Sequence, residues 1–119
     1  MVVQPTLREL LNAGVHFGHK TARWNPNMEQ YIFCSKNKVH VINLEKTAEE
    51  LEKASEFLKK LSAEGKTVVF VGTKKQATGI IKKAAVDCGM PYVNFRWVGG
   101  MLTNFNNVRE AIERFKKEK

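Results

Sequence analysis

Apolar and polar positions in the first third of the chain predict a short helix and then a pair of strands. Thr6 and Glu9 have the spacing of a capping box, in which a hydroxyl and a carboxylate each bind a backbone amide at a helix start. Leucines at helical spacing follow, and Gly14 stands where a helix would end. Residues 15–30 have no regular period and are predicted to form a loop. Residues 31–44, with β-branched and aromatic side chains around a polar turn, predict strand, turn and strand.

The middle of the chain carries a long helical pattern and then a run of apolar residues. Leucine and alanine recur at helical spacing over residues 45–64, where Thr47 and Glu50 have the spacing of a second capping box. Residues 67–71 are then nearly all apolar. Such a run is typical of a strand that is covered on both faces, as in a parallel sheet.

A further helix, strand and helix complete the pattern. Thr73 and Gln76 have the spacing of a third capping box, and the apolar stripe behind them predicts a helix that ends at a glycine. Residues 92–97 predict another strand. A last helix is expected to begin near Asn106 or Asn107.

Strands therefore alternate with helices along the chain. This order is typical of α/β proteins, in which right-handed crossovers join the strands of a parallel sheet. We expect one α/β domain over residues 1–119. A three-stranded parallel sheet is small for this architecture, and no glycine or proline ends the last helix. The sequence predicts that the sheet is incomplete and that the chain is part of a longer protein.

Composition adds a positive charge to this picture. The 119 residues are 43% apolar, enough for a folded core, and 20 basic residues against 12 acidic ones give a net charge of +8. The pI of about 9.7 is typical of proteins that bind polyanions, although a merely basic soluble protein would share it. Charge alone therefore favours nucleic acid only moderately.

No segment has the features of a targeting signal or a membrane span. The first residues lack the basic and apolar order of a signal peptide, and no apolar stretch approaches the ~20 residues that cross a bilayer. We expect a cytosolic protein, or one in a compartment derived from the cytosol, with no membrane association. Cys34 and Cys88 are isolated and are expected to be reduced thiols.

Residues 72–75 occupy the position where α/β enzymes bind phosphate, between a predicted strand and a predicted helix. A P-loop needs a glycine where Thr67 stands, and the dinucleotide motif needs one where Lys74 stands. No nucleophile, base and orienting group can be identified either, so we expect no enzyme activity and no cofactor. A helix start with two lysines suits one RNA phosphate, although a solvated first turn explains it equally well.

A pair of histidines raises the question of a metal site. His16 and His19 are three positions apart, with Cys34 or His40 as the candidate for a further ligand. Structural zinc sites usually bring paired cysteines, whereas Cys34 and Cys88 lie 54 positions apart. We therefore expect no metal, and we interpret the histidines as loop residues that hydrogen-bond RNA or backbone.

Several polar segments carry the residues that we expect to bind RNA. In them, basic side chains that suit phosphates stand beside amide, hydroxyl or aromatic groups that suit bases and sugars. The alternatives are ordinary solubility for the charged residues and a role as core anchors for the tryptophans. The predicted residues are His16, His19, Lys20, Arg23, Trp24, Asn25, Lys36, Asn37, Lys38, Thr73, Lys74, Lys75, Arg96, Trp97, Thr103 and Asn104.

Longer stretches of the sequence resemble one protein family. Residues 14–19 read Gly-Val-His-Phe-Gly-His, residues 24–28 read Trp-Asn-Pro-Asn-Met, and residues 96–104 read Arg-Trp-Val-Gly-Gly-Met-Leu-Thr-Asn. Together with residues 31–47 and 70–74, these motifs resemble, in order and spacing, the small-subunit ribosomal protein number two family of bacterial or organellar type. The resemblance extends over nearly the whole chain.

The resemblance implies an α/β domain of Rossmann-like or flavodoxin-like order, with a protruding helical hairpin that would begin in residues 106–119. It implies a structural constituent of the small ribosomal subunit that binds ribosomal RNA, near other small-subunit proteins including protein number one, without cofactor or catalysis. The location would be the ribosome, in the cytoplasm or in an organelle matrix or stroma. Members of the family continue beyond this point, so we expect an uncovered sheet flank to make the isolated chain either marginally stable or self-associating.

Two other functions compete with the RNA-binding hypothesis. A nucleotide-binding enzyme fragment of the same fold class would bind a free nucleotide. A protein–protein scaffold with incidental charge would show no preference for small-subunit ribosomal RNA. The leading hypothesis, many weak phosphate contacts made by basic loops in support of translation, predicts an affinity that falls steeply with salt.

Overall fold

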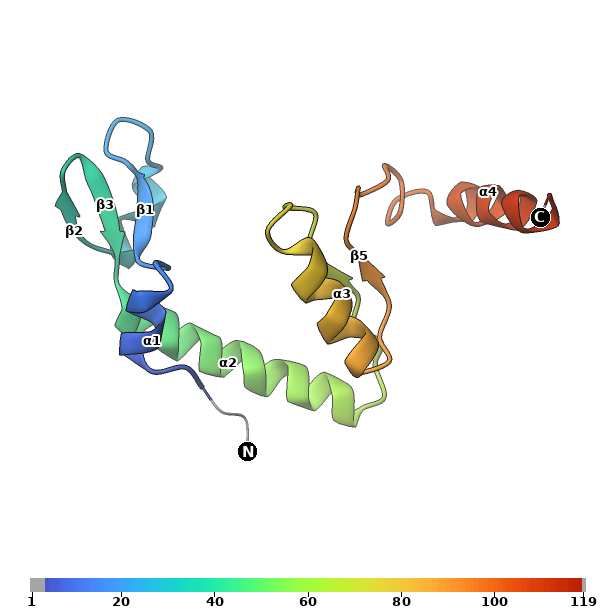
Figure 1. Ribbon diagram of the computed structural model, residues 1–119, viewed down its shortest axis with the longest axis horizontal. Coiled ribbons are helices and arrows are strands. Elements are labelled where there is room, and N and C mark those ends of the chain that lie inside the picture. The colour runs from blue at the N-terminus through green and yellow to red at the C-terminus, as the bar shows by residue number, and fades with distance from the viewer. Residues whose placement is uncertain (1–3, 119) are drawn as a thin grey trace. The chain divides into compact units, whose positions relative to one another are not determined.

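The computed structural model describes residues 4–118, which divide after Gly65 into two compact units (Figure 1). Among the described residues, the first unit holds two α-helices, a 3-10 helix and an antiparallel sheet, and the second holds two α-helices and a pair of parallel strands. The mixed α/β class predicted from the sequence is confirmed. The single domain expected over residues 1–119 remains a prediction.

Helix α1 (Leu7–Asn12) begins at the capping box expected from the sequence. The Thr6 backbone N–H donates to Glu9 Oε2 over 2.7 Å, and the Glu9 N–H donates to Thr6 Oγ1 over 3.3 Å. Leu10 is the residue of this helix that is buried. Gly14 follows with a φ of +73°, a left-handed conformation that lets the chain turn away from the helix.

Three short strands form the antiparallel sheet of the first unit, with the third strand in the centre. They are β1 (Phe17–Lys20), β2 (Ile32–Lys36) and β3 (Val39–Ile42). The loop predicted over residues 15–30 is wrong, because this segment contains β1 and the 3-10 helix η1 (Pro26–Tyr31). The hydrogen bonds of β1 come from a strand much later in the chain, which local periodicity does not reveal.

The turn between β2 and β3 places two residues in the left-handed region. Asn37 has a φ of +52° and Lys38 a φ of +60°. Positive φ at both central residues is typical of a type I′ turn, whose twist matches that of the two strands. The strand, turn and strand predicted over residues 31–44 are therefore confirmed.

Helix α2 (Leu44–Ala63) starts earlier than its predicted cap. Asn43 Oδ1 accepts a hydrogen bond from the Glu45 N–H over 3.0 Å, so Asn43 is the N-cap. The capping box predicted at Thr47 and Glu50 is wrong, because both residues lie inside the helix. The Thr47 hydroxyl donates instead to the Asn43 carbonyl oxygen over 3.2 Å. The long helix itself is confirmed.

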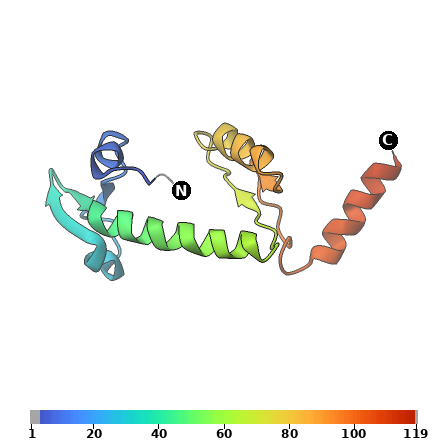
Figure 2. The same ribbon diagram turned by 90° about the horizontal axis from the view of Figure 1, so that it is seen from below.

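The second unit contains a parallel strand pair. Strand β4 (Phe70–Val71) pairs with β5 (Tyr92–Val93), and helix α3 (Thr78–Asp87) connects them. Figures 1 and 2 show α3 alongside the two strands. Parallel pairing is confirmed, but both strands are shorter than the predicted residues 67–71 and 92–97. The parallel sheet described here has two strands rather than three, because the hairpin of β2 and β3 pairs antiparallel with β1.

The chain passes very close to helix α3 just after strand β4 ends. A Cβ on Gly72, directly after β4, would lie 2.3 Å from the Cγ1 atom of Ile81 on α3. Glycine is therefore required for α3 to pack so near the strand. Ala85, one turn further along the helix, is fully buried.

The start of α3 differs from the sequence-based expectation. A capping box at Thr73 and Gln76 is wrong, because the N-cap position is Ala77, which provides no side-chain hydrogen bond. The segment before the helix forms a tight turn instead, in which the Lys74 carbonyl oxygen accepts the N–H of Ala77 over 2.8 Å and that of Thr78 over 3.2 Å. The first turn of α3 consequently has no side-chain cap.

Helix α4 (Phe105–Lys117) begins close to its expected start and carries an exposed apolar face. Phe105, Ile112 and Phe115 are all about half exposed or more. The helical hairpin expected to begin in residues 106–119 remains a prediction, and Lys119 lies outside the described residues.

Candidate nucleic-acid interface

The sheet of the first unit brings together two segments that the sequence singled out separately. Lys20 on β1 and Lys36 on β2 both pair with Val39 of the central strand β3, from opposite sides. Residues paired in this way project from the same face, and two strand spacings separate the lysine backbones by roughly 10 Å. Lys38 adjoins Val39 in the turn, and its carbonyl oxygen accepts the Thr21 N–H over 2.9 Å. Three lysines therefore meet at one end of one sheet.

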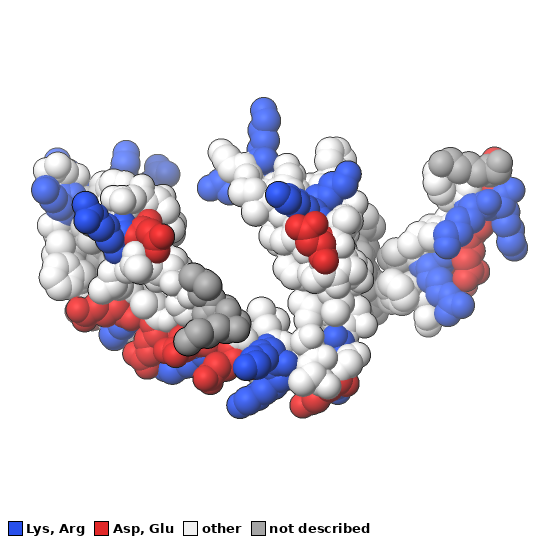
Figure 3. All heavy atoms as spheres, turned by 60° about the horizontal axis from the view of Figure 1, so that its bottom comes forward, with Lys and Arg blue, Asp and Glu red and all other residues white. Residues whose placement is uncertain are grey.

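These cations are exposed and lie apart from the ion pairs of the described residues. Ion pairs join Lys53 to Glu49 and Glu50 on α2, and Arg109 to Glu113 on α4. By contrast, residues 16–38 contain Lys20, Arg23, Lys36 and Lys38 against a single acidic residue, Glu29. Figure 3 shows Lys and Arg side chains around the sheet and acidic side chains along α2.

The charges on α2 largely compensate one another. Lys53 donates hydrogen bonds to Glu49 over 2.6 Å and to Glu50 over 2.9 Å. These bonds raise the pKa of Lys53, and the bond from Lys53 lowers the pKa of Glu49. Carboxylates already paired in this way add little repulsion toward an RNA phosphate.

Rings within residues 16–24 contact other rings of the same unit. Trp24 is half-buried, with its ring 4.7 Å from that of His40, and His16 lies 4.2 Å from Phe17. Sequence reasoning did not assign His40 to the candidate interface. Neither ring nitrogen of His40 has a hydrogen-bond partner within the described residues. The anchor alternative therefore gains support for Trp24.

Asn25 and His19, which were also predicted to bind RNA, differ in their surroundings. Asn25 Oδ1 accepts the Asn27 N–H over 3.0 Å and caps η1, so Asn25 shapes the segment. His19 is exposed beside Lys20. Within residues 4–118, no three histidine, cysteine or acidic side chains gather as a metal site would require.

The second unit gathers its predicted residues at the carboxyl edge of the parallel strands. Residues 73–75 follow β4 and Arg96 follows β5, and in a parallel pair these ends meet at one edge. The Gly72 N–H donates to the Val93 carbonyl oxygen over 2.9 Å, which joins the two ends. Asn94, which sequence reasoning missed, donates its side-chain N–H to the Thr78 carbonyl oxygen over 3.3 Å.

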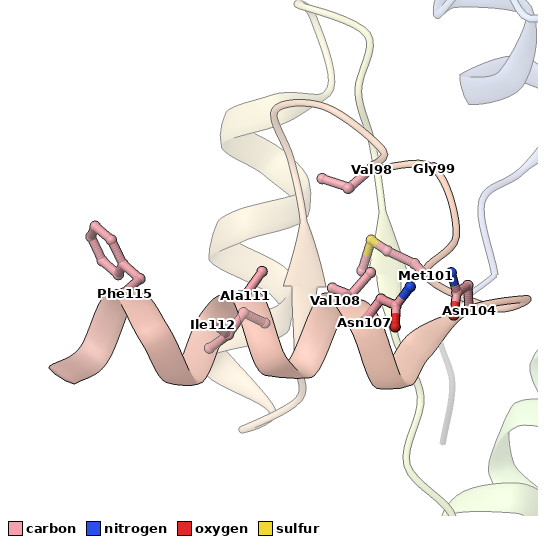
Figure 4. A pocket seen from close by; sticks show the side chains of 9 residues that line it. All are labelled: Val98, Gly99, Met101, Asn104, Asn107, Val108, Ala111, Ile112 and Phe115. Carbon is pink, nitrogen blue, oxygen red and sulfur yellow. The ribbon is translucent and has the colours of Figure 1, made fainter. Parts of the chain in front are cut away.

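Trp97, Thr103 and Asn104 lie further along the same connection, next to α4. The Asn104 N–H donates to the Gly100 carbonyl oxygen over 2.7 Å, and Gly100 has a φ of +84°. Asn104 also contributes to an apolar hollow of about 550 Å³ between this connection and α4 (Figure 4). Its main apolar lining residues are Val98, Met101, Val108, Ala111, Ile112 and Phe115.

A second hollow, of about 640 Å³, lies on the sheet of the first unit and was not predicted. Phe17 and Phe33 line it, together with Lys36, Val39 and Val41. Aromatic residues and lysines in the same short strands are the sequence signal that could have indicated this hollow. Using that signal, however, requires that strand β1 be recognised first.

No helix within residues 4–118 has the length and apolar character needed to cross a bilayer. This finding concerns the described residues only.

Comparison with known proteins adds two findings. A family model described as Ribosomal protein S2 matches residues 10–119. The small ribosomal subunit protein uS2 of Coprothermobacter proteolyticus is 54% identical over 112 residues, which are 94% of this chain and 42% of that protein. The chain therefore spans less than half the length of this curated relative.

Proposed function

The chain belongs to the ribosomal protein S2 family, and from that premise we propose that it is a structural, RNA-binding part of the small ribosomal subunit. This family consists of ribosomal proteins and not of enzymes, in keeping with the broken phosphate-binding motifs at residues 72–75. We include in the proposal a location on the ribosome, in the cytoplasm or in an organelle matrix or stroma. Its partners are then small-subunit ribosomal RNA and neighbouring ribosomal proteins, among them protein number one.

The observation that carries the RNA-binding part is the meeting of Lys20, Lys36 and Lys38 at one end of the sheet. Their charges are exposed and compensated by none of the ion pairs of the described residues. Phosphate groups of an RNA backbone would supply the missing negative charge, and each contact would release a bound counterion from the RNA. Arg23, whose N–H donates to the Lys20 carbonyl oxygen over 2.9 Å, adds a fourth cation nearby.

The second unit offers a further seat for phosphate in this proposal. Lys74 and Lys75 are exposed just before α3, a ten-residue helix whose first turn has no side-chain cap. The positive end of the helix dipole favours an anion at such a position. Arg96 lies at the same edge of the parallel strands. In this proposal, the lysines of the first unit and the start of α3 both bind phosphate without regard to the base sequence of the RNA.

The proposal is tested by titrating the chain with fragments of small-subunit ribosomal RNA over a series of salt concentrations, with unrelated RNA as competitor. We expect a preference for the ribosomal fragments, and a log affinity that falls by roughly 0.7–0.9 per neutralised phosphate for each log unit of salt. Equal affinity for unrelated RNA would contradict the assignment to ribosomal RNA. Binding of a free nucleotide, together with weak RNA binding, would instead favour the enzyme-fragment alternative.

A further inference from the structure

One face of the sheet in the first unit presents two aromatic rings to solvent. Phe17 is 68% exposed and Phe33 is 74% exposed, although both are large apolar side chains in strands. Both line the hollow of about 640 Å³, whose floor includes Val39 and Val41 of the central strand. This volume lies within the range of about 300–1,000 Å³ that is usual for pockets that hold small organic groups.

Cations border the same face. Lys36 lines the hollow, and Lys20 pairs with Val39, so its side chain projects from the side on which Val39 lies. No acidic residue is among those that line the hollow. The face thus combines exposed rings with positive charge at one end, and its charge is complementary to a polyanion.

We propose that this face binds single-stranded RNA, with bases stacked on Phe17 and Phe33 and the backbone phosphates directed to Lys20 and Lys36. The inference rests on the proposed function, because ribosomal RNA provides the ligand. To that function it adds the form of the RNA, which is single-stranded, and the side chains that bind it. Aromatic platforms flanked by cations bind unpaired strands, since every base has a flat face. A duplex keeps its bases stacked on one another and has none to offer.

The chain contains its own reporter for this site. Cys34 lies on β2, lines the hollow and is exposed, whereas Cys88 lies beyond the end of α3 in the other unit. Oligouridine bound on the sheet face would slow alkylation of Cys34 and leave the rate at Cys88 unchanged. Equal rates at Cys34 with and without saturating oligouridine would overturn the proposal.

Affinity measurements with the full chain complete the test. We expect Phe17→Ala and Phe33→Ala each to weaken binding of a short oligouridine by roughly 5- to 150-fold, since each removes a stacking partner. Phe17→Tyr and Phe33→Tyr keep the ring and should bind as the unaltered chain does. Phe57→Ala, which removes a 60% exposed ring from α2, is the matched control and should bind normally. Affinity for an RNA duplex should not change in any of these variants.

The outcomes separate this inference from the proposed function. If Lys20→Ala and Lys36→Ala weaken RNA binding while Phe17→Ala and Phe33→Ala leave it unchanged, the stacking site is refuted and the ribosomal RNA function stands. If the alanine variants bind RNA normally but lose self-association, the face is occupied by protein and the proposal is wrong. If the unaltered chain binds no RNA, both proposals fail together.

Discussion

Gly72 and Ile81 are so close that a Cβ on the glycine would lie 2.3 Å from the isoleucine Cγ1 atom. This contact joins the residue that follows β4 to the first turn of α3. The hydrogen of glycine is the only substituent that leaves room for Ile81 without movement of the helix, because Cβ atoms do not approach other carbons so closely.

Replacing Gly72 with alanine should therefore destabilise the second unit. We expect Gly72→Ala to lower the free energy of unfolding by about 1–3 kcal/mol, the usual cost of overpacking. Gly79→Ala on α3 is the matched control, because a Cβ there would meet no atom within 4 Å. The control should raise stability by about 0.5–1 kcal/mol, since alanine favours helix. Urea titration followed by circular dichroism measures both, and equal effects would contradict the contact.

Lys38 occupies a left-handed conformation that favours glycine, with a φ of +60°. Lys38→Gly should raise the free energy of unfolding by about 0.5–1 kcal/mol, because relief of a strain of ~1–2 kcal/mol exceeds the added chain entropy of glycine. The same variant should weaken RNA binding, since it removes one cation. Lys59→Gly on α2 removes one cation from outside the interface; it is the control for lost charge and should leave RNA affinity nearly unchanged. A variant of Lys38 that gains stability and retains full RNA affinity would remove this lysine from the interface.

Alanine substitution of Lys20 or Lys36 should reduce the dependence of RNA affinity on salt. Each lost phosphate contact should lower the slope of log affinity against log salt by roughly 0.7–0.9. Lys59→Ala on α2 removes an equal charge from outside the interface and should leave the slope nearly unchanged. Filter binding or fluorescence anisotropy at several salt concentrations provides the slopes. A reduction as large for Lys59→Ala would show that net charge alone controls binding.

The Thr6 backbone N–H and hydroxyl both donate to Glu9 and lower the pKa of the Glu9 carboxyl. The capping box therefore stabilises α1 fully above the unfolded-state pKa of Glu9, about 4.3, and this contribution is lost as pH falls through the lower folded-state pKa. In Thr6→Ala, the hydroxyl bond is absent and the pKa of Glu9 should rise toward its ordinary value. Carboxyl NMR titration measures it. The lowered pKa of Glu49, which depends on Lys53, should stay the same.

Self-association of the isolated chain is a further expectation, and the apolar face of α4 is the place to test it. Ile112 is 47% exposed and lines the hollow beside the helix. We expect sedimentation velocity to show species larger than a monomer, and Ile112→Glu to shift them toward the monomer. Asn106→Glu adds the same charge to α4 outside the hollow and should have little effect. A monomer at all concentrations would contradict the expectation.

Elements whose evidence is local could be predicted from the sequence. The capping box of Thr6 and Glu9, the long helix α2 and the turn at Asn37 and Lys38 all depend on neighbouring residues. Strand β1 could not be predicted, because its hydrogen bonds come from β3 and because Gly18 within it reads as an interruption. In the structure, Gly18 instead allows the backbone of β3 to pass close by, since a Cβ there would lie 3.0 Å from the His40 carbonyl oxygen.

Two capping boxes were predicted wrongly because the spacing of two residues does not show where a helix begins. The spacing of hydroxyl and carboxylate or amide at Thr47 and Thr73 is also compatible with a helix interior or a turn. A cap requires an extended residue at the helix start, and Asn43, with φ of −71° and ψ of 107°, fulfils this for α2. The candidate site could likewise be predicted only in part. Its lysines could be named from the sequence, but their meeting depends on the register of three strands.

The exposed apolar side chains described for both units also affect how the chain responds to temperature. Leu10 and Ala85 are the hydrophobic residues that are buried among those described, whereas Phe17, Phe33 and Phe115 remain largely in water. Unfolding then adds less newly hydrated apolar surface than in a domain with a large buried core, and such surface is the main source of the heat-capacity increment of about 12–15 cal/mol/K per residue in ordinary domains. A smaller increment gives a flatter stability curve, so warming and cooling should change the folded population only gradually.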